Sequence, residues 1–248
     1  MIDLQTYYPW SGKKKKPFRP FRYVKRAILF VLAASILSVI TLRWLPPPTS
    51  SFMLQAYTLE RWNGRSDVKL QYHWVDRRGI SPNAVLAVIA AEDQKFPYHW
   101  GFDRDAIVEA LEERRKGTRI RGASTITQQV AKNLFLWPGK SFVRKGIEAY
   151  FTVLIEVLWS KRRIVEVYLN IAQFGRGIFG ISAASRIFFG KAPSHLSRKE
   201  CALLAAALPN PLRLRIDRPS TYMRQRSNRI LNEMGRMGRI ELTASFLR

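Results

Sequence analysis

An uninterrupted apolar run near the start of the chain sets the first limit on its fold. Residues 27–42 read AILFVLAASILSVITL and carry no charge. Crossing a bilayer takes about 20 mostly apolar residues, with about 17 as the usual lower limit. Trp44 and Leu45 lengthen the run if the Arg43 side chain reaches the interface and the tryptophan lies at it. The sequence therefore predicts a transmembrane helix over 27–45.

The flanks of this run distinguish the possible uses of it. A basic tail precedes it and Pro46-Pro47-Pro48 follows it, a setting that does not suit a helix buried in a globular core. A cleaved signal peptide is the other alternative, but the basic region is too long and no clear small-residue cleavage site follows. The positive-inside rule predicts a cytoplasmic tail over 1–26. In a bacterium, everything after Pro48 would then lie in the periplasm.

The charge of the chain is strongly positive, at +24. Residues 1–26 hold eight Lys and Arg against Asp3 alone, which is 8 − 1 = +7 and leaves 24 − 7 = +17 for the rest. Such an excess predicts a polyanionic partner: nucleic acid, anionic lipid or a phosphorylated substrate. The predicted topology argues against nucleic acid as the partner and leaves membrane lipids and a phosphorylated substrate.

Cys201 is the single cysteine, so we expect neither a disulfide framework nor a cysteine-based metal site.

The chain beyond the apolar run is predicted to be mainly α-helical. Residues 46–80 form a linker and the start of the extramembrane domain; they lack sustained periodicity and contain strand-like patches such as 70–75. The helical domain covers 81–248, without strand–helix alternation or internal repeats. Caps, apolar periodicity and Gly or Pro stops predict helices over 82–91, 103–116, 125–135, 142–159, 161–172, 178–188, 201–208 and 221–237.

Glu92 is the first candidate for chemistry. It follows eight consecutive apolar or small residues, 84–91. A carboxylate at the end of a buried helix loses solvation, so its pKa should rise toward the range of a general base. The alternative is a helix-terminal acid on the surface. Asp93 points about 100° away around the helix and is expected to be a structural partner.

The segment 121–133 is the second candidate. Thr125-x-x-Gln128 fits a capping box, and helix geometry places Thr125, Gln128, Gln129 and Lys132 on one stripe. A helix N-terminus, amides and a lysine on one side form a cradle for phosphate or sugar. The alternative is an ordinary amphipathic helix with a solvated polar face. The opposite, apolar stripe is expected to face the core: Ile126, Val130 and Leu134.

A third candidate lies at 144–156, where Arg144 and Glu148 share a helix face and Lys145 adds a charge. The commoner interpretation of such a pair is a helix-stabilising ion pair.

The G-x-G-x-x-G match at 175–180 follows a helical stretch rather than a strand, so no nucleotide site is predicted. His73, His99 and His195 make no zinc pattern, and no metal ligand is predicted.

Five motifs occur in order at compact spacing and are more specific together than singly. They read EDQKFPYHWGFD (92–103), RGASTITQQVAKN (121–133), RKGIEAYFTVLIE (144–156), KRRIVEVYLN (161–170) and GISAASRIFFGK (180–191). This constellation resembles the peptidoglycan glycosyltransferase family, glycosyltransferase family 51, over roughly residues 50–240. Its monofunctional members lack the transpeptidase domain that follows in class A penicillin-binding proteins, and we expect no such domain here.

The resemblance implies a lysozyme-like helical domain that lies against the bacterial inner membrane and polymerises lipid II with release of undecaprenyl pyrophosphate. It implies that Glu92 is the general base for the acceptor 4-hydroxyl, with inversion at the donor anomeric carbon, and that Glu148 is the second catalytic acid. The positions expected to bind substrate are Asp93, Ser124, Thr125, Gln128, Gln129, Lys132, Asn133, Arg144 and Lys145.

The implied partners are lipid II, the nascent glycan strand, membrane lipids and other cell-wall synthesis and division proteins. No cofactor is expected to be required, and a divalent cation, Mg²⁺ or Mn²⁺, at the pyrophosphate stays open. A membrane-bound lytic glycosidase of similar fold is the main rival. Such a hydrolase has little use for cations around a pyrophosphate, so Lys132, Arg144 and Lys145 favour synthesis.

Overall fold

The computed structural model describes residues 20–64, 69–117, 124–139 and 141–237. The chain divides into two compact units, Met1–Ser38 and Val39–Arg248. Most of the predicted basic tail, part of the 121–133 motif and the last eleven residues lie outside the described ranges. Each unit is considered by itself below.

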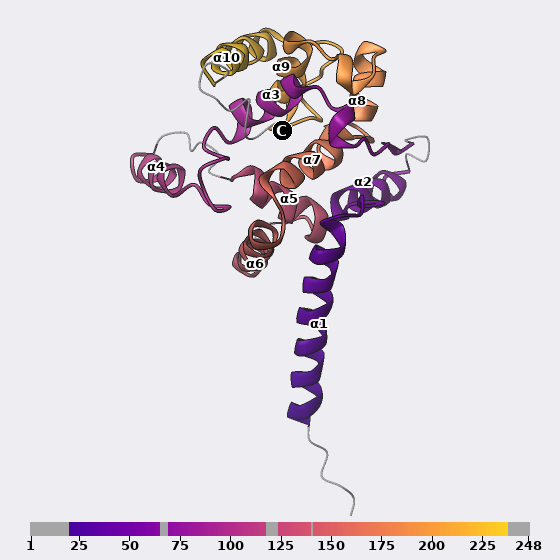
Figure 1. Cartoon of the computed structure of the whole chain (residues 1–248), viewed down its shortest axis with the longest axis vertical. Helices are drawn as coiled ribbons and strands as arrows, with labels where there is room; N and C mark the ends of the chain where they lie inside the picture. The colour runs from indigo at the N-terminus through magenta and orange to yellow at the C-terminus, as the bar shows by residue number, and fades with distance from the viewer. Residues whose placement is uncertain (1–19, 65–68, 118–123, 140, 238–248) are drawn as a thin grey trace, which may run out of the picture. The chain divides into compact units, whose positions relative to one another are not determined.

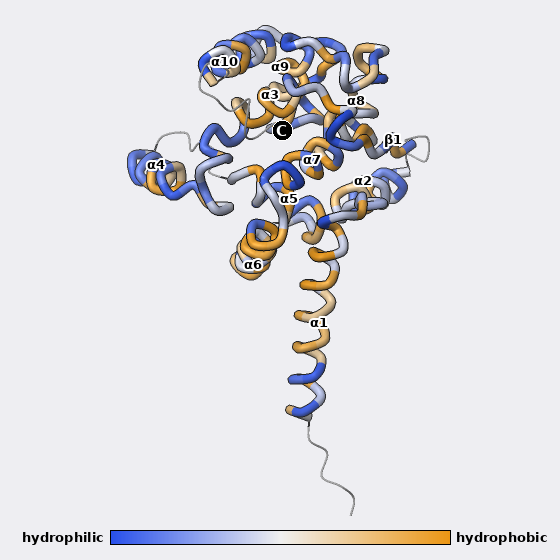
Figure 2. The backbone as a smooth tube through the Cα atoms, in the orientation of Figure 1, coloured by the Kyte–Doolittle hydropathy of each residue, from blue (hydrophilic) through white to orange (hydrophobic). Residues whose placement is uncertain are grey.

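The described part of the first unit belongs to one helix, α1 (Pro20–Leu42). Its segment Phe21–Leu42 has 22 residues and is long and apolar enough to cross a membrane. Figure 2 shows hydrophobic residues along most of α1 and hydrophilic ones at its start. The helix differs from the predicted 27–45 at both ends. Arg22, Lys25 and Arg26 are good helix formers and extend it toward the N-terminus, while Trp44 and Leu45 lie in a turn and a bend and do not extend it.

The second unit is built from helices with one small sheet (Figure 1). Its helices are α2 (Ser51–Trp62), α3 (Pro82–Glu92), α4 (Arg104–Arg115), α5 (Ile126–Phe135), α6 (Phe142–Leu158), α7 (Lys161–Ile171), α8 (Gly180–Phe189), α9 (Arg198–Ala207) and α10 (Thr221–Met237), with short 3₁₀ turns η2 (Arg77–Gly79) and η3 (Pro193–His195). The prediction of a mainly α-helical domain is confirmed, and the expected helices from α3 onward are present within a few residues.

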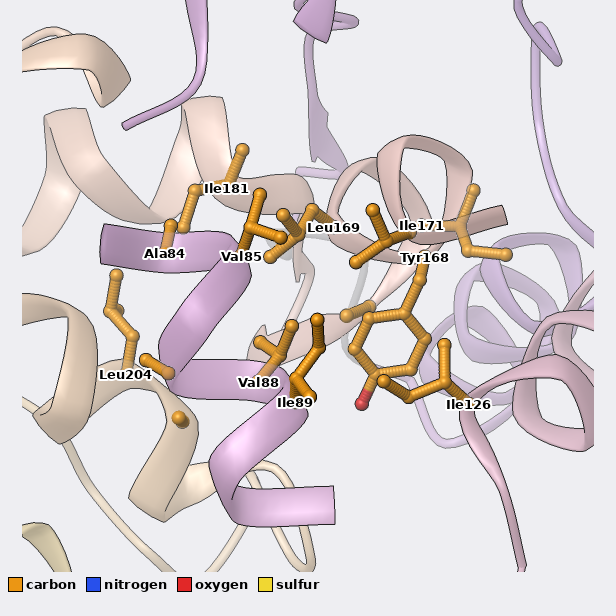
Figure 3. Close-up of a cluster of buried hydrophobic side chains, with 14 of the residues drawn as sticks. Ala84, Val85, Val88, Ile89, Ile126, Tyr168, Leu169, Ile171, Ile181 and Leu204 are labelled. Carbon is orange, nitrogen blue, oxygen red and sulfur yellow. The ribbon is translucent and has the colours of Figure 1, made fainter. Parts of the chain in front are cut away.

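The helix α3 forms the centre of the core. Ser81 caps it by accepting from the Asn83 N–H, and Pro82 occupies its first turn. Its apolar run is buried on nearly all sides because α9 and α10 pack on one side and α5, α7 and α8 contribute side chains on the other. Figure 3 shows Val85 and Ile89 of α3 beside side chains of α7, with the Tyr168 ring between Ile89 and Ile126 of α5. This packing fixes the end of α3, where Glu92 lies.

A second group of helices completes the domain. The helix α5 packs against α6, α7 and α2, and α7 packs against α8. The stripe predicted to face the core from α5 is confirmed, since Ile126 and Val130 are fully buried and Leu134 nearly so. Figure 1 shows α3, α9 and α10 gathered on one side of α7 and α5 and α6 on the other. The C-terminal end of α3 therefore faces helices of this second group, which contains α5, α6 and α7.

One small sheet accompanies the helices, and its first strand lies in the strand-like patch at 70–75. Three short strands, β1 (Gln71–Tyr72), β2 (Gln173–Gly175) and β3 (Ile178–Phe179), form a sheet of order β1–β3–β2. The strand β3 pairs parallel with β1 and antiparallel with β2 across a turn at Gly177, whose φ is +69°. The glycine-rich 175–180 segment is thus a hairpin, and the helix expected from Ile178 begins at Gly180.

Gly180 is held where a side chain could not fit. Its φ is +80°, and a Cβ there would lie 2.5 Å from the Asn170 carbonyl oxygen. Asn170 itself is fully buried; its amide bonds the backbone N–H and C=O of Val75 at 2.9 Å each. These contacts tie α7 to the start of α8 and to the segment before α3.

Candidate active site

Glu92 is the last residue of α3 and lies at the edge of the core. Its side chain is 13% exposed. Burial raises the pKa of this carboxyl, and Asp93 adds to the increase, while Gln129, Arg226 and Lys132 partly offset it. The interpretation of Glu92 as a solvated surface acid is therefore wrong. A carboxylate with a raised pKa in a partly open position has the properties of a general base.

Both oxygens of Glu92 are held by donors from distant parts of the chain. Gln129 of α5 donates from Nε2 to Oε2 at 3.0 Å, and Arg226 of α10 donates from Nη2 to Oε1 at 3.3 Å. Lys132, one turn after Gln129, contributes a further positive charge. These contacts orient the carboxylate and bring three helices to one point.

Asp93 has a different function from its neighbour. Its side chain is 2% exposed, with Oδ1 at 2.8 Å from His99 Nε2 and Oδ2 accepting from the Ile126 N–H at 2.9 Å. Ile126 opens α5, so Asp93 caps the positive end of that helix. Because both oxygens are occupied by protein groups, the assignment of Asp93 to substrate binding does not fit the geometry; the expected structural role does.

The predicted capping box at the start of α5 is confirmed. Thr125 accepts from the Gln128 N–H at 3.2 Å, and Gln128 Oε1 accepts from the Thr125 N–H at 3.0 Å. Both side chains are buried, and Thr125 also donates to the Gly101 carbonyl at 2.7 Å. The predicted polar stripe is therefore divided: Thr125 and Gln128 build the helix end, whereas Gln129 and Lys132 face the carboxylates.

Lys132 is the half-buried cation of the stripe. Burial lowers its pKa, and Glu148 and Glu92 act in the opposite direction. Its Nζ lies 5.5 Å from the centre of the Phe52 ring, and it makes no hydrogen bond or ion pair with any described residue. An ammonium group without a protein counter-ion in direct contact is free to bind an anion.

Glu148 of α6 lies among cations. It is 2% exposed; Arg144 Nη1 donates to its Oε2 at 3.1 Å and Lys145 Nζ to its Oε1. The helix begins here because Ser141 caps it by accepting from the Arg144 N–H at 3.1 Å. The predicted ion pair is present, but it is buried on the carboxylate side and leaves the Lys145 side chain half exposed.

Two of the expected substrate-binding residues, Ser124 and Asn133, are exposed and half-buried respectively. Neither side chain makes a hydrogen bond to another residue in the ranges that the structure describes. Ser124 lines a cleft of about 330 Å³ beside Glu92, together with residues of α3 and α4. This cleft offers open space directly next to the candidate base.

No group of three or more His, Cys, Asp or Glu side chains among the described residues is arranged to hold a metal ion. Three positively charged residues, Lys132, Arg144 and Lys145, are brought together around Glu148 by the helices α5 and α6.

Comparison with known proteins agrees with this arrangement. The transglycosylase family model matches residues 60–235, more than half of the chain and the whole of the site. The chain belongs to the transglycosylase family.

Relatives within this family are similar along most of their length. A biosynthetic peptidoglycan transglycosylase of Pseudomonas entomophila is 49% identical over 217 residues, which cover 88% of this chain and 92% of the relative. Proteins of the same description from Shewanella oneidensis and Pectobacterium carotovorum are 49% and 50% identical, over 90% and 88% of this chain and 95% and 89% of their own. The chain is accordingly a peptidoglycan glycosyltransferase.

Sequence reasoning missed two residues that this transglycosylase site contains. Arg226 bonds Glu92 from 134 positions away, and Tyr168 donates to Gln129 Oε1 at 3.2 Å from α7. Arg226 lies in a basic helix and has nothing local to distinguish it from its neighbours. Tyr168 lies inside the 161–170 motif, which was the one available signal.

A buried network supports the site from behind. Glu156 accepts from Thr127 Oγ1 at 2.5 Å and from Lys161 Nζ at 2.8 Å, and Lys161 also donates to the His99 carbonyl at 2.6 Å. These bonds join α5, α6 and the 93–101 loop of the transglycosylase domain. The loop that carries Asp93 and His99 is thereby held against the helix that carries Gln129 and Lys132.

Proposed function

We propose that this enzyme polymerises lipid II into glycan strands by inverting glycosyl transfer. Glu92 removes the proton of the acceptor 4-hydroxyl, whose oxygen attacks the donor anomeric carbon from the face opposite the pyrophosphate. The bond from that carbon to the pyrophosphate oxygen breaks, and undecaprenyl pyrophosphate leaves with the electron pair. The proton stays on Glu92 until it passes to solvent.

The observation that carries this proposal is that one site contains both a buried carboxylate and a cluster of cations. Glu92 is a carboxylate with a pKa raised by burial, and Lys132, Arg144 and Lys145 form a positive cluster around Glu148. A pyrophosphate leaving group develops negative charge and needs cations more than a proton. A glycosidase would instead need an acid that protonates the leaving sugar oxygen.

The substrate is a membrane lipid, and two features suit work at a membrane. The helix α1 has the length and composition of a single-pass anchor, and its basic flank favours a cytoplasmic N-terminus and a periplasmic catalytic domain. Independently, α6 presents an apolar face to the outside: Phe142 and Val143 at its start and Val153 and Val157 further along are all exposed. Apolar exposure of this kind is typical of lipid contact.

The test is a polymerisation assay with the full chain in detergent or liposomes. Wild type should convert lipid II into polymer and should leave finished glycan strands uncut. Glu92→Gln should be folded and nearly inactive. Glu233→Gln, which changes a half-buried carboxylate on α10 that pairs with Arg236, should match wild type. Cleavage of glycan without polymerisation, or a near-normal rate for Glu92→Gln, would contradict the proposal.

The role of a divalent cation is tested in the same assay. Because three protein cations are already available, we expect chelation with EDTA to lower the rate without abolishing it. Mg²⁺ or Mn²⁺ should then restore the lost part by binding the pyrophosphate oxygens. Complete loss in EDTA would mean that the protein cations are insufficient.

A further inference from the structure

Tyr168 of α7 is buried beside the active site without touching the cleft. Its side chain is 1% exposed. Figure 3 shows its ring among apolar side chains, next to Ile89 and Ile126, with its oxygen at the edge of the cluster. Close packing around the ring leaves the hydroxyl one position, 3.2 Å from Gln129 Oε1.

Gln129 connects this hydroxyl to the candidate base. Its amide oxygen accepts from Tyr168, and its amide nitrogen donates to Glu92 Oε2 at 3.0 Å. Burial and the nearby charges of Glu92 and Asp93 raise the pKa of Tyr168 well above its ordinary value, so its proton stays available for donation. A donor on the amide oxygen polarises the amide and strengthens its N–H as a donor.

We propose that Tyr168 is a positioning residue for the glycosyl transfer, acting through the amide of Gln129 to hold and orient the carboxylate of Glu92. This inference rests on the proposed function of Glu92 as general base. Tyr168 itself is placed behind Gln129 and takes no part in proton transfer. Its task is to keep the Gln129 amide nitrogen directed at Glu92 in every catalytic cycle.

The other groups that act on Glu92 do not depend on Tyr168. Arg226 reaches it from α10, Lys132 acts from α5, and Asp93 adjoins it on its own chain segment. Glu109 and Glu113 of α4 line the same cleft. Removal of the Tyr168 hydroxyl therefore weakens one contact, the donor from Gln129. Since that donor lowers the pKa of Glu92, its weakening should raise the pKa further.

Tyr168→Phe tests the inference because it keeps the ring and deletes only the hydroxyl. We expect kcat to fall about tenfold, part of the roughly 10²–10⁴-fold that a general base contributes. The acidic limb of the rate against pH should move to higher pH, and the KM for lipid II should stay near that of wild type. A purely structural defect would not move the limb.

Tyr72→Phe is the matched control. Tyr72 is half-buried, and its hydroxyl donates to the Pro47 carbonyl at 2.6 Å, away from Glu92. Burial raises its pKa to about 12, so it too is a protonated donor. We expect this variant to keep the wild-type rate and pH profile even if its thermal stability falls.

A double-mutant cycle with Gln129→Leu shows whether Tyr168 acts through the amide. Gln129→Leu alone should shift the acidic limb upward, and adding Tyr168→Phe should change the rate little further. The inference would be overturned if Tyr168→Phe lowered kcat by the same factor in the wild-type and the Gln129→Leu backgrounds. It would also be overturned if the acidic limb of Tyr168→Phe stayed at the wild-type pH.

The outcomes separate this inference from the proposed function. If Glu92→Gln retains activity, the base assignment fails first. If Glu92→Gln is inactive while Tyr168→Phe behaves like Tyr72→Phe, only the role of Tyr168 fails. If Tyr168→Phe does not fold, the pH profile of Gln129→Leu tests the inference. An acidic limb that stays at the wild-type pH in Gln129→Leu would mean that the Gln129 amide does not affect Glu92, and Tyr168 could then not act through it.

Discussion

Glu92 and Glu148 are chemically identical side chains in surroundings of different kinds. Glu92 lies at the end of a buried helix and is held by a neutral amide and one distant arginine. Glu148 lies in the first turns of α6, where two cations of its own helix occupy its oxygens. The first setting favours uptake of a proton, whereas the second holds two cations beside one carboxylate. One site thus contains a base and a support for a cationic cluster.

The sharpest way to break this comparison is to neutralise each carboxylate in turn. Glu92→Gln should lower the polymerisation rate by about 10²–10⁴-fold, the usual contribution of a general base. In wild type, the rate should fall as pH drops through the raised pKa of Glu92, because the protonated acid cannot accept a proton. The residual rate of Glu92→Gln should lack this acidic limb, which a pH series in the lipid II assay measures.

Glu148→Gln should also slow the reaction, by about 10²-fold, because the cations that it gathers lose their fixed arrangement. The difference lies in the profile: its acidic limb should remain where wild type has it, because Glu92 is intact. The same pH series is the measurement. If the limb vanished with Glu148 and persisted without Glu92, the assignments would have to be exchanged.

Lys132 sharpens the comparison because it interacts electrostatically with both Glu92 and Glu148. Lys132→Met keeps the apolar stem and removes the charge. We expect a loss of about 10²-fold in kcat/KM, typical of deleting one electrostatic contact to developing charge. Lys199→Met, which removes an exposed lysine on α9, is the control. Equal rates for the two variants would exclude Lys132 from the anionic site.

A substitution at Asp93 tests whether the residue next to Glu92 in the sequence takes part in the reaction. Asp93→Asn removes the charge that caps α5 and weakens the bonds to Ile126 and His99. We expect the free energy of unfolding to fall by about 1–3 kcal/mol, the cost of disturbing a buried hydrogen-bonded group. Thermal denaturation measures it. Unchanged stability with lost activity would return Asp93 to the group that binds substrate.

The smallest expected effect concerns stability at Glu92 itself. Its folded-state pKa is raised, so the ionised carboxylate destabilises the fold above that pKa and not below the ordinary one. Glu92→Gln should therefore melt slightly higher than wild type at neutral pH, and the gain should fade as pH falls through the two values. A lower melting temperature at pH 7 would mean that the Arg226 contact outweighs burial.

Local signals predicted most of the helices, and their physical cause is visible in the caps. The boundaries at Ser81, Thr125 and Ser197 follow side chains that bond the first turn of α3, α5 and α9. Such bonds connect residues two or three apart, so the sequence alone contains them.

The helix α2 was not predicted, although Ser50 caps it. Its apolar residues lie on several faces: Met53 is fully buried, while Leu54 and Leu59 are exposed. No stripe of period 3.6 results, and periodicity cannot find the helix. The strands of the sheet are two or three residues long, too short for alternation to be visible.

The site was predicted where it is local and missed where it is assembled by the fold. Glu92 ends its own apolar helix, and Arg144 and Glu148 lie one turn apart. By contrast, Tyr168 and Arg226 reach Gln129 and Glu92 across 39 and 134 positions. Spacing along the chain has no information on such pairs. It also does not show that the polar stripe of α5 divides into the buried Thr125 and Gln128 and the residues that face the carboxylates.

The contact between Arg226 and Glu92 has a consequence for the order in which the enzyme becomes active. Arg226 lies on α10, the last helix that the structure describes, and Glu92 lies on the third. A chain that emerges from its N-terminus presents Glu92 long before Arg226 is available. The carboxylate acquires its second donor only when the C-terminal helix docks onto α3. Glu92 therefore has both of its donors only after α10 has been synthesised and has packed against α3.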